Sequence, residues 1–479
     1  MKSKAVELLS EAIKRIRHWR VWDSWWIEEW MDEWLNIRDR LEVRLRSKYN
    51  EEAINDLLKL IDKFISQNEK LWNYWRDVSN EVNKLIKDLI NGSAEVIIRG
   101  EDVSGISVHG EYVTLETHRT NTGIVVRLVL KGLRGMTIRT LNVFKKTMSK
   151  EEYVKFINKV LKALKGGLEE TDGIVNKGKA AIGTSQLWQV VIWSLLHPGK
   201  AHTYISGINI NEENVTIMWY LKSYEHNALK GLFLNDVERL DIEELLAFML
   251  TAILGDGTVD IRKTVKDDRV YNGGAIIEIT LASHKFDRWK PLLCKLQSVG
   301  FKSSKPKIQN NTVKVGFYDS NAIDLTRAII NVLPPILRDI LDALSFDKWD
   351  NLRRIAKMEL KWRKGESQVI VANYKFTVAV RESTVELVRK TGDGVEARKV
   401  IDELRAVYGD EFHARVNNNG KRLAVKISMY VFERYDEIKR QVIEVLRRKL
   451  EKTKDEKKKQ IIIKHLTRLT TLTEGAATD

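Results

Sequence analysis

The sequence is short of residues that cross-link or break a chain. Among 479 residues it has one cysteine, Cys294, and five prolines. A single cysteine excludes an intramolecular disulfide and any zinc site built from several thiolates, and it favours a reducing, cytoplasmic compartment. The first 91 residues hold neither glycine nor proline. Their absence predicts long uninterrupted helices there.

Apolar runs are also short. The most apolar stretch, Leu245–Leu254, is too short to cross a bilayer. The N-terminal segment Met1–Ile13 already mixes charged and apolar side chains, so it lacks the apolar core of a signal peptide. We therefore expect a soluble, unprocessed chain with no membrane partner.

Acidic residues are outnumbered by basic ones. There are 81 Lys and Arg against 66 Asp and Glu, which gives a net charge of +15. This balance favours a polyanionic partner, because each phosphate neutralised by Lys or Arg releases condensed counterions. The alternative is a thermophilic surface rich in ion pairs, and the two interpretations are compatible.

Tryptophan is concentrated near the N-terminus, where we predict a helical hairpin over residues 1–92 with its break near Lys48–Glu51. Four tryptophans recur every four residues and so share one helical face: Trp22, Trp26, Trp30 and Trp34. Trp72 and Trp75 begin an apolar stripe that can oppose them. We interpret the hairpin as a structural or dimerisation element. The alternative, a platform that stacks bases or docks a protein, is less favoured for nucleic acid because Glu28 and Glu29 lie between the indoles.

Residues 93–238 predict a second, α+β domain. Alternating β-branched residues between 95 and 143, punctuated by glycines, indicate a small antiparallel sheet. Helices are predicted near 150–168 and 185–196, with a short strand at 215–220. We interpret residues 176–185 as a loop before the second helix, because their glycine spacing does not fit a phosphate loop.

Residues 239–345 carry the most informative pattern. Asp241 can cap a helix that is apolar nearly all round and stops at Gly255-Asp256-Gly257. Such a helix must be buried, and another helix is its expected partner. The order that follows gives an αββαββα domain, with strands at 258–262 and 275–281, a helix at 285–299, strands at 304–309 and 312–317, and a helix at 322–332.

This order, headed by a buried helix that ends in an acid and a glycine, resembles one repeat of the LAGLIDADG homing endonucleases. The nine-residue motif aligns with Met249–Gly257, with Asp256 as its final acid. Thr251 and Gly255 match the small residues that let two motif helices approach, and Leu254 replaces the first acid of the family motif. In layout, the chain also resembles multi-copy, mobile-element-associated families of hyperthermophilic archaea.

The resemblance implies a specific chemistry. In the family, two motif helices place their terminal carboxylates side by side, and each holds Mg²⁺ beside the scissile phosphate. It implies that Asp256 is a catalytic residue and a metal ligand, with the Gly255 carbonyl as another ligand. It also implies an assisting lysine, either Lys305 or Lys307. The sheet would supply the surface that reads nucleic acid, with these candidates: Arg262, Lys263, Lys266, Arg269, Lys302, Lys305, Lys307 and Lys314.

Gly-Asp-Gly is also an ordinary helix stop, so the strand and helix order that follows it decides in favour of the motif. A nuclease of this type needs two carboxylates, so the chain must dimerise or contain a second repeat. The best internal candidate is Leu387–Gly394, but Arg389 and Lys390 are charged where a buried helix should be apolar, which favours a plain turn. The C-terminal region 346–479 is predicted to be α+β, with a degenerate second repeat as one interpretation and a charged helical tail.

The fold class predicted is therefore α+β. The leading function is site-selective binding of double-stranded DNA by a LAGLIDADG-like core, and the resemblance adds Mg²⁺-dependent phosphodiester cleavage through Asp256 as an activity that the residues leave open. Two alternatives stay open. The protein could be a non-catalytic DNA- or RNA-binding regulator or splicing helper, or it could serve in assembly for a mobile element. A homodimer remains an alternative to two repeats in one chain.

Overall fold

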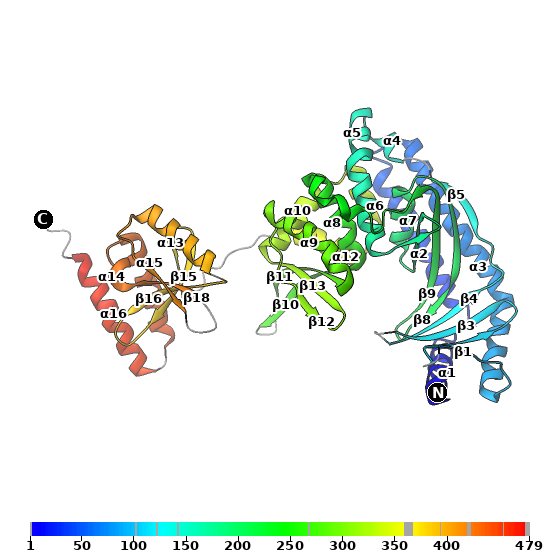
Figure 1. Cartoon of the computed structure of the whole chain (residues 1–479), viewed down its shortest axis with the longest axis horizontal. Coiled ribbons are helices and arrows are strands. Elements are labelled where there is room, and N and C mark those ends of the chain that lie inside the picture. The colour runs from blue at the N-terminus through cyan, green and yellow to red at the C-terminus, as the bar shows by residue number, and fades with distance from the viewer. Residues whose placement is uncertain are drawn as a thin grey trace. The chain divides into compact units, whose positions relative to one another are not determined.

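The computed structural model describes residues 2–100, 103–120, 123–140, 143–266, 269–358, 367–392, 394–418, 423–453 and 455–474. The chain is α+β and divides into two compact units, Met1–Glu359 and Leu360–Asp479 (Figure 1). None of the helices in the described ranges is both long and apolar enough to span a membrane.

The N-terminal region forms three helices rather than a simple hairpin: α1 (Lys2–His18), α2 (Trp25–Leu45) and α3 (Glu51–Asn91). The predicted break near residue 50 is confirmed, because the Asn50 side chain caps α3 by accepting a hydrogen bond from the Glu52 amide, at 2.8 Å. Gly92 ends α3 in the left-handed conformation that glycine adopts most easily. The extra break after His18 was not predicted.

The tryptophan stripe is part of the core. Trp26 and Trp34 are fully buried. Trp34 stacks on Phe64 of α3, with ring centroids 5.2 Å apart, and meets Trp219 of strand β9 (Val215–Asn227) edge to face at 5.8 Å. Helices α2 and α3 therefore cover one face of the sheet that contains β9, which supports the structural interpretation of this region.

Unit 1 contains a nine-stranded antiparallel sheet with strand order β1-β2-β3-β4-β8-β9-β7-β6, and β5 pairs with β8. Its strands are β1 (Ile97–Arg99), β2 (Gly105–His109), β3 (Val113–Thr120), β4 (Gly123–Leu130), β5 (Met136–Thr140), β6 (Gly173–Asn176), β7 (Lys179–Thr184), β8 (Gly199–Ile210) and β9. The antiparallel strands predicted between 95 and 143 are confirmed. They do not form a separate small sheet, because β4 pairs with β8.

One other sequence interpretation of this region was wrong. The segment taken as a loop before a helix is the β6–β7 hairpin, whose turn places Lys177 at φ 51° and Gly178 at φ 74°. The strand predicted at 215–220 is confirmed but is longer than predicted: it is the thirteen-residue β9, which pairs with the long strand β8. The helices of this part of the chain are α4 (Val143–Thr147), α5 (Lys150–Lys155), α6 (Leu161–Thr171) and α7 (Leu187–Leu196), with a π-helical turn at Phe156–Val160 and a 3₁₀ turn at Phe233–Arg239.

The αββαββα order predicted after residue 239 is confirmed. Its elements are α8 (Ile242–Asp256), β10 (Gly257–Lys266), β11 (Arg269–Ala282), α9 (Ser283–Ser298), β12 (Lys307–Gln309), β13 (Thr312–Tyr318) and α10 (Ser320–Asn331). The strands form a sheet of order β10-β11-β13-β12. Strands β10 and β11 are longer than the predicted strands at 258–262 and 275–281, because β10 runs on to Lys266 and β11 begins at Arg269. Helices α11 (Pro335–Leu344) and α12 (Asp347–Ala356) complete unit 1.

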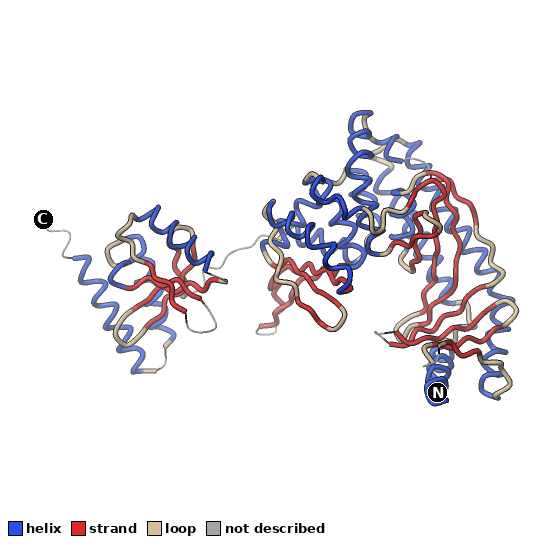
Figure 2. Tube along the Cα trace, viewed as in Figure 1, coloured by secondary structure: helices blue, strands red, loops and turns tan. Residues whose placement is uncertain are grey.

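The same arrangement occurs twice in unit 1. From α6 to β9, residues 161–227, the order is helix, two strands, helix, two strands, and the sheet order is β6-β7-β9-β8. From α8 to β13, residues 242–318, both orders are the same. We call these segments the first repeat and the second repeat. Figure 2 shows their strands and helices within unit 1.

Unit 2 is a five-stranded antiparallel sheet, of order β14-β15-β16-β18-β17, packed with helices. Its elements are β14 (Gln368–Val371), β15 (Tyr374–Val380), β16 (Val385–Thr391), α13 (Gly394–Tyr408), β17 (Ala414–Asn418), β18 (Leu423–Ser428), α14 (Met429–Phe432), α15 (Asp436–Lys452) and α16 (Glu456–Glu474). The order β15-β16-β18-β17 matches the strand order of each repeat. The candidate motif at Leu387–Gly394 is not a buried helix end, because Leu387 lies within strand β16; Asp393 is outside the described residues.

Candidate functional site

Helix α8 delivers Asp256 to one end of the four-stranded sheet. The Asp241 side chain accepts a hydrogen bond from the Glu244 amide, at 2.9 Å, and the Glu244 side chain accepts one from the Asp241 amide, at 2.8 Å. This capping box fixes where α8 begins. Its residues from Leu245 to Leu254 are all buried, as the sequence predicted. Strand β10 begins at Gly257, so Asp256 lies at the junction of helix and sheet.

The buried partner of α8 is α6, at the head of the first repeat. Gly167 of α6 is the closest point of contact, because a Cβ there would overlap the Phe248 carbonyl oxygen and the Thr251 hydroxyl. The Thr251 hydroxyl donates a hydrogen bond to the Leu164 carbonyl, at 2.8 Å. The two helices thus pack so closely that only glycine fits at position 167, and close packing of this kind is what small residues in a helix pair permit.

The sequence of α6 contains a second copy of the motif, which the sequence analysis missed. When Gly166–Gly173 is aligned with Leu250–Gly257, Gly167 corresponds to Thr251 and Thr171 to Gly255. Asp172 then corresponds to Asp256, and each is followed by a glycine that begins a strand. Both motif helices therefore come from one chain. The partner carboxylate, Asp172, precedes the predicted motif Met249–Gly257 in the sequence, whereas the sequence candidate at Leu387–Gly394 follows it.

The contacts between the two motif helices are complementary. Gly167 accommodates Thr251, and Gly255 accommodates Thr171 together with the Asp172 carboxylate, since a Cβ on Gly255 would overlap both. At each level a glycine on one helix faces a larger side chain on the other. This pairing places the carboxylate of Asp172 against the end of α8, next to Asp256.

The two carboxylates have different surroundings. Asp256 is exposed, whereas Asp172 is partly buried. Burial, and then the negative charge of Asp256, raise the pKa of Asp172 to about 6. Repulsion between the two acids shows that their charges interact, so a cation placed between them would be stabilised by both.

Two lysines approach the carboxylates from outside the motifs. The Lys348 ammonium, at the start of α12, donates hydrogen bonds to the carbonyl oxygens of Leu254, at 2.9 Å, and Gly255. The Lys230 ammonium donates to the Gly173 carbonyl, at 2.5 Å. Burial lowers the pKa of both lysines, while the charges of Asp172 and Asp256 act in the opposite direction. Neither lysine was among the predicted site residues.

The predicted basic residues lie farther along the second sheet. Lys302, Lys305 and Lys307 are exposed, the first two before β12 and the third on it. They are absent from the groups that act on the Asp172 pKa, which include Lys348 and Lys230. Strand residues Lys263, Lys266 and Arg269 have side chains outside the described set. The assignment of Lys305 or Lys307 as the assisting lysine stays a prediction.

Each sheet has one face covered by helices and one uncovered face. In the second repeat, residues on the covered face are buried: Val259, Ile261, Ile277, Ile279, Val315 and Phe317. The uncovered face carries Arg262, whose guanidinium lies 5.6 Å from the Tyr318 ring centroid. It also carries Lys314, paired with Glu278 at 3.2 Å. Two of the predicted contact residues are therefore on this face, beside an acid that reduces its positive charge.

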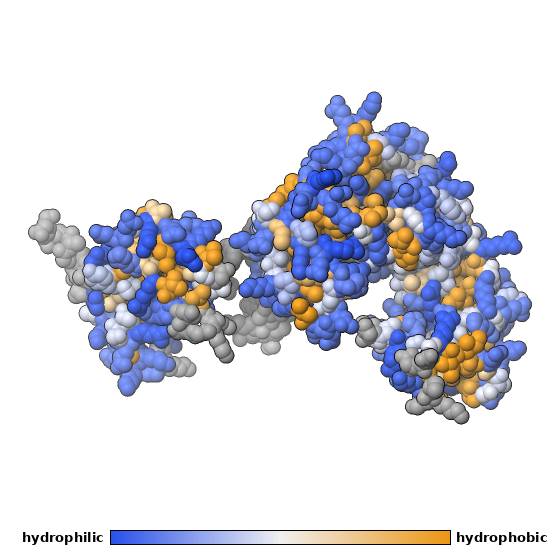
Figure 3. All heavy atoms as spheres, viewed as in Figure 1, coloured by the Kyte–Doolittle hydropathy of each residue, from blue (hydrophilic) through white to orange (hydrophobic). Residues whose placement is uncertain are grey.

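The first repeat offers an uncovered face richer in aromatic residues. Tyr204 and Tyr220 lie side by side on β8 and β9 with ring centroids 5.1 Å apart, and His202 is 5.6 Å from Tyr204. Lys222 donates to the Asn176 side chain at 3.0 Å. Stacking rings beside cations suit the bases and phosphates of nucleic acid. The space-filling view shows unit 1 hollowed between the part with the β10–β13 sheet and the part with β1–β4 (Figure 3).

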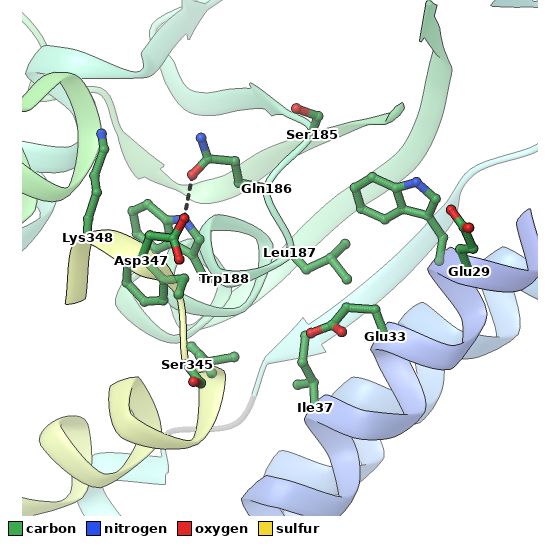
Figure 4. Close-up of a pocket in the computed structure, with 13 residues that line it drawn as sticks. Glu29, Glu33, Ile37, Ser185, Gln186, Leu187, Trp188, Ser345, Asp347 and Lys348 are labelled. Carbon is green, nitrogen blue, oxygen red and sulfur yellow. Dashed lines mark hydrogen bonds between the residues drawn. The ribbon is translucent and has the colours of Figure 1, made fainter. Parts of the chain in front are cut away.

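A pocket of 540 Å³ lies on the other side of Lys348, among α2, the β7–α7 turn and the start of α12. Figure 4 shows Lys348 extending away from Glu29 and Glu33, which lie on α2 at the far side of this pocket. Trp188 stacks on Phe346 with ring centroids 4.4 Å apart and forms part of its wall. Because Glu29, Glu33 and Asp347 line the pocket, it does not suit a phosphate.

The comparisons with known proteins add little to this geometry. No family model and no curated protein matches the chain. Among solved structures, the chain is similar to the N-terminal LAGLIDADG domain of DUF199/WhiA, at 13% identity and a TM-score of 0.22, over 40% of this chain and 84% of that one. It is also similar to full-length DUF199/WhiA from Thermatoga maritima, at 10% identity and a TM-score of 0.22, over 66% of this chain and 92% of that one. Both scores are low, so the description of the site depends on the residues and contacts of this chain.

Proposed function

We propose that the protein cleaves phosphodiester bonds of nucleic acid in a metal-dependent reaction, with double-stranded DNA as the substrate. The observation that carries this proposal is the pair of acids, Asp172 and Asp256, each at the end of one of two helices packed against each other. An acid at both helix ends supplies the pair of carboxylates that a metal-dependent nuclease needs, whereas nucleic-acid binding alone needs only the fold. This pairing supports cleavage over binding alone.

The residues fit a hard divalent cation such as Mg²⁺. Two neighbouring carboxylates supply oxygen ligands, which Mg²⁺ prefers. The pKa of Asp172 is raised first by burial and then by the negative charge of Asp256, and a cation between the two acids would counter the second of these effects. Within the described part of the chain no three His, Cys, Asp or Glu side chains gather as a metal-binding group. The remaining ligands would be water and phosphate oxygens, as is usual for Mg²⁺. When bound, the ion would activate water and stabilise the leaving oxygen.

The other residues would position the strand and balance its charge. Asp172 must lose its proton to hold a cation, so activity should rise with pH through about 6. Lys230 and Lys348 bring positive charge to the two helix ends, where it can stabilise negative charge that develops on the phosphate. The uncovered sheet faces would hold the duplex on both sides of the carboxylates.

A second function, binding without cleavage, is favoured by one specific contact. The Gly255 carbonyl, predicted as a metal ligand, already accepts a hydrogen bond from Lys348. An ammonium beside two carboxylates can neutralise them in place of a metal ion. In that case, the protein would be a regulator or helper that binds DNA or RNA.

Nicking of supercoiled plasmid DNA in Mg²⁺ or Mn²⁺ tests the two functions. For a nuclease we expect Asp172→Asn and Asp256→Asn each to slow cleavage about 1,000-fold, equivalent to about 4 kcal/mol of transition-state stabilisation. Asp39→Asn is the matched control, because Asp39 is an exposed acid on α2, away from the uncovered sheet faces, and should leave the rate unchanged.

Binding measured in EDTA separates the alternatives. Unchanged affinity in the two Asn variants, with cleavage lost, supports the nuclease. Tight, salt-dependent binding by a wild type that never nicks DNA or RNA would instead establish the binding function. Affinity that does not respond to salt would contradict both and favour an assembly role.

A further inference from the structure

Unit 2 contains a pocket that no part of the paired-motif site uses. Its volume is 520 Å³, within the range of about 300–1,000 Å³ that is typical of small-ligand sites. It lies where the end of β15, the end of α15 and the first turns of α16 meet. For this region the sequence predicts only a charged helical tail.

The side chains around the pocket are strongly basic. Glu382 is the one acid among the residues that line it, against five basic residues: Arg381, Arg448, Lys449, Lys452 and Lys458. Val380, Ile461 and Ile462 give the same pocket an apolar wall. Clustered cations beside an apolar surface suit a ligand that has both a phosphate and a ring.

Lys449 is the most informative of these residues. Its ammonium is partly buried and donates a hydrogen bond to the Val378 carbonyl, at 2.7 Å. Burial lowers the pKa of Lys449, and among the residues that the structure describes no carboxylate opposes that shift. A buried ammonium without a counter-charge destabilises the fold. A bound anion would remove that penalty.

The acids near the other basic residues lie outside the pocket. Arg448 pairs with Glu444 at 3.1 Å, and Lys458 is 3.8 Å from Asp455. Neither acid is among the residues that line the pocket. Arg448 and Glu444 are four residues apart on α15, and Asp455 directly precedes α16. Such pairs with partners exposed to solvent contribute little. Their cations therefore remain available to a ligand.

The net charge of unit 2 also favours an anionic ligand. Residues 360–479 contain 27 Lys and Arg against 18 Asp and Glu, whereas residues 1–359 contain 54 against 48. A quarter of the chain thus carries more than half of the net positive charge. A polyanion would be attracted first to this unit.

We propose that this pocket binds a nucleotide unit of a nucleic-acid strand, with the phosphate on Lys449 and its basic neighbours and the ring against the apolar wall. The proposal adds a second nucleic-acid site, separate from the paired carboxylates. It does not require the protein to be a nuclease.

The test is binding of the full-length protein to a short fluorescent oligonucleotide in EDTA. We expect Lys449→Met to weaken binding about tenfold at low salt and to lower the slope of log affinity against log salt by about 0.7, the loss of one phosphate contact on a single strand. Thermal stability should stay equal or rise, because methionine keeps the aliphatic chain and removes the buried charge. Arg381→Gln, on the exposed rim, should reduce affinity in the same direction without affecting the core.

Lys399→Met is the matched control, because it removes one charge from an exposed position on α13 of the same unit. Equal effects of Lys449→Met and Lys399→Met would overturn the proposal and leave only general charge attraction. Displacement of the oligonucleotide by a free nucleoside monophosphate of equal affinity would also overturn it, in favour of a small-nucleotide site. Because the assay is run in EDTA, metal-dependent cleavage does not contribute to it, so failure of cleavage and failure of this pocket are measured separately.

Discussion

The two repeats of unit 1 have the same order of elements and the same strand order, but their motif helices are made from different residues. Helix α8 is apolar along its buried length, whereas α6 buries the charged residues Glu169 and Glu170. Glu169 lies 2.9 Å from the His197 ring nitrogen Nε2. A motif helix of this fold can therefore contain buried charged residues when each of them has a partner.

The differences between the repeats are also coordinated. Each glycine at the helix contact faces a threonine on the other helix, Gly167 facing Thr251 and Gly255 facing Thr171. A symmetrical pair of glycines would leave space, and a symmetrical pair of threonines would not fit. The repeats are therefore complementary rather than interchangeable.

The largest effect expected from this comparison is on stability at the helix contact. Gly167→Ala should destabilise unit 1 by about 3 kcal/mol, because its Cβ would meet a backbone carbonyl that cannot move aside. Gly255→Ala should cost less, since the atoms it meets belong to side chains. The measurement is the unfolding transition of unit 1, followed by calorimetry.

Gly183→Ala is the control for both substitutions. Its Cβ would meet only the Ile174 side chain, at an ordinary contact distance of 3.6 Å, so we expect almost no change. If Gly167→Ala proved as mild as this control, α6 and α8 would not pack as closely as described.

The second effect is the pH dependence that Asp172 confers on the fold. Its pKa is about 6 in the folded chain and 3.8 for the ordinary side chain, so the folded state holds the proton more tightly. The contribution of Asp172 to the free energy of unfolding is therefore greatest below about pH 4. It falls as the pH rises through about 6, by about 2 kcal/mol after allowance for the remaining contact of the carboxyl group with water. Asp172→Asn should remove this fall and be more stable than wild type at pH 8.

Unfolding of both proteins across pH 4 to 8 measures this difference. The negative charge of Asp256 contributes to the raised pKa of Asp172. Asp256→Asn should therefore lower the pKa of Asp172, because it removes that charge. Identical pH profiles for wild type and Asp172→Asn would contradict the raised pKa of Asp172, and identical profiles for wild type and Asp256→Asn would contradict the interaction between the two acids.

The smallest effect concerns the position two residues before each of the paired acids, which is Glu170 in the first repeat and Leu254 in the second. The Glu170 carboxylate pairs with Arg288 at 3.0 Å and accepts a hydrogen bond from the Gly231 amide at 2.8 Å. Glu170→Leu copies the residue of the second repeat and should cost about 1 kcal/mol, because the partly exposed Arg288 can turn to water. Glu28→Leu, at an exposed glutamate on α2, should change the unfolding temperature of unit 1 by less.

The sequence predicted the second repeat well because its signals are local. Asp241 caps α8, ten consecutive buried residues follow, and Gly257 begins a strand; the alternation that follows defines the sheet. Those signals concern neighbours in the chain, so they can be read without a structure. The α+β class and the element order followed from them.

The first repeat was missed for a physical reason. The sequence of α6 is typical of a solvent-exposed helix because it contains Lys165, Glu169 and Glu170. A motif helix buried against a partner is expected to be apolar, so α6 did not fit that expectation. Their partners are remote in sequence: His197 for Glu169, Arg288 for Glu170, and the His226 ring 3.1 Å from the Lys165 ammonium. The pair Asp172-Gly173 after a double glycine was the signal that could have identified it.

The sequence by itself determined a basic α+β chain with one acid at the end of a buried helix, because helix caps, apolar periodicity and turns depend on nearby residues. Only the tertiary structure decided what lies beside that acid: Asp172 from the other repeat, and Lys230 and Lys348 from outside both motifs. Groups that lie far apart in the chain interact through packing, and packing also determined which buried charges found partners.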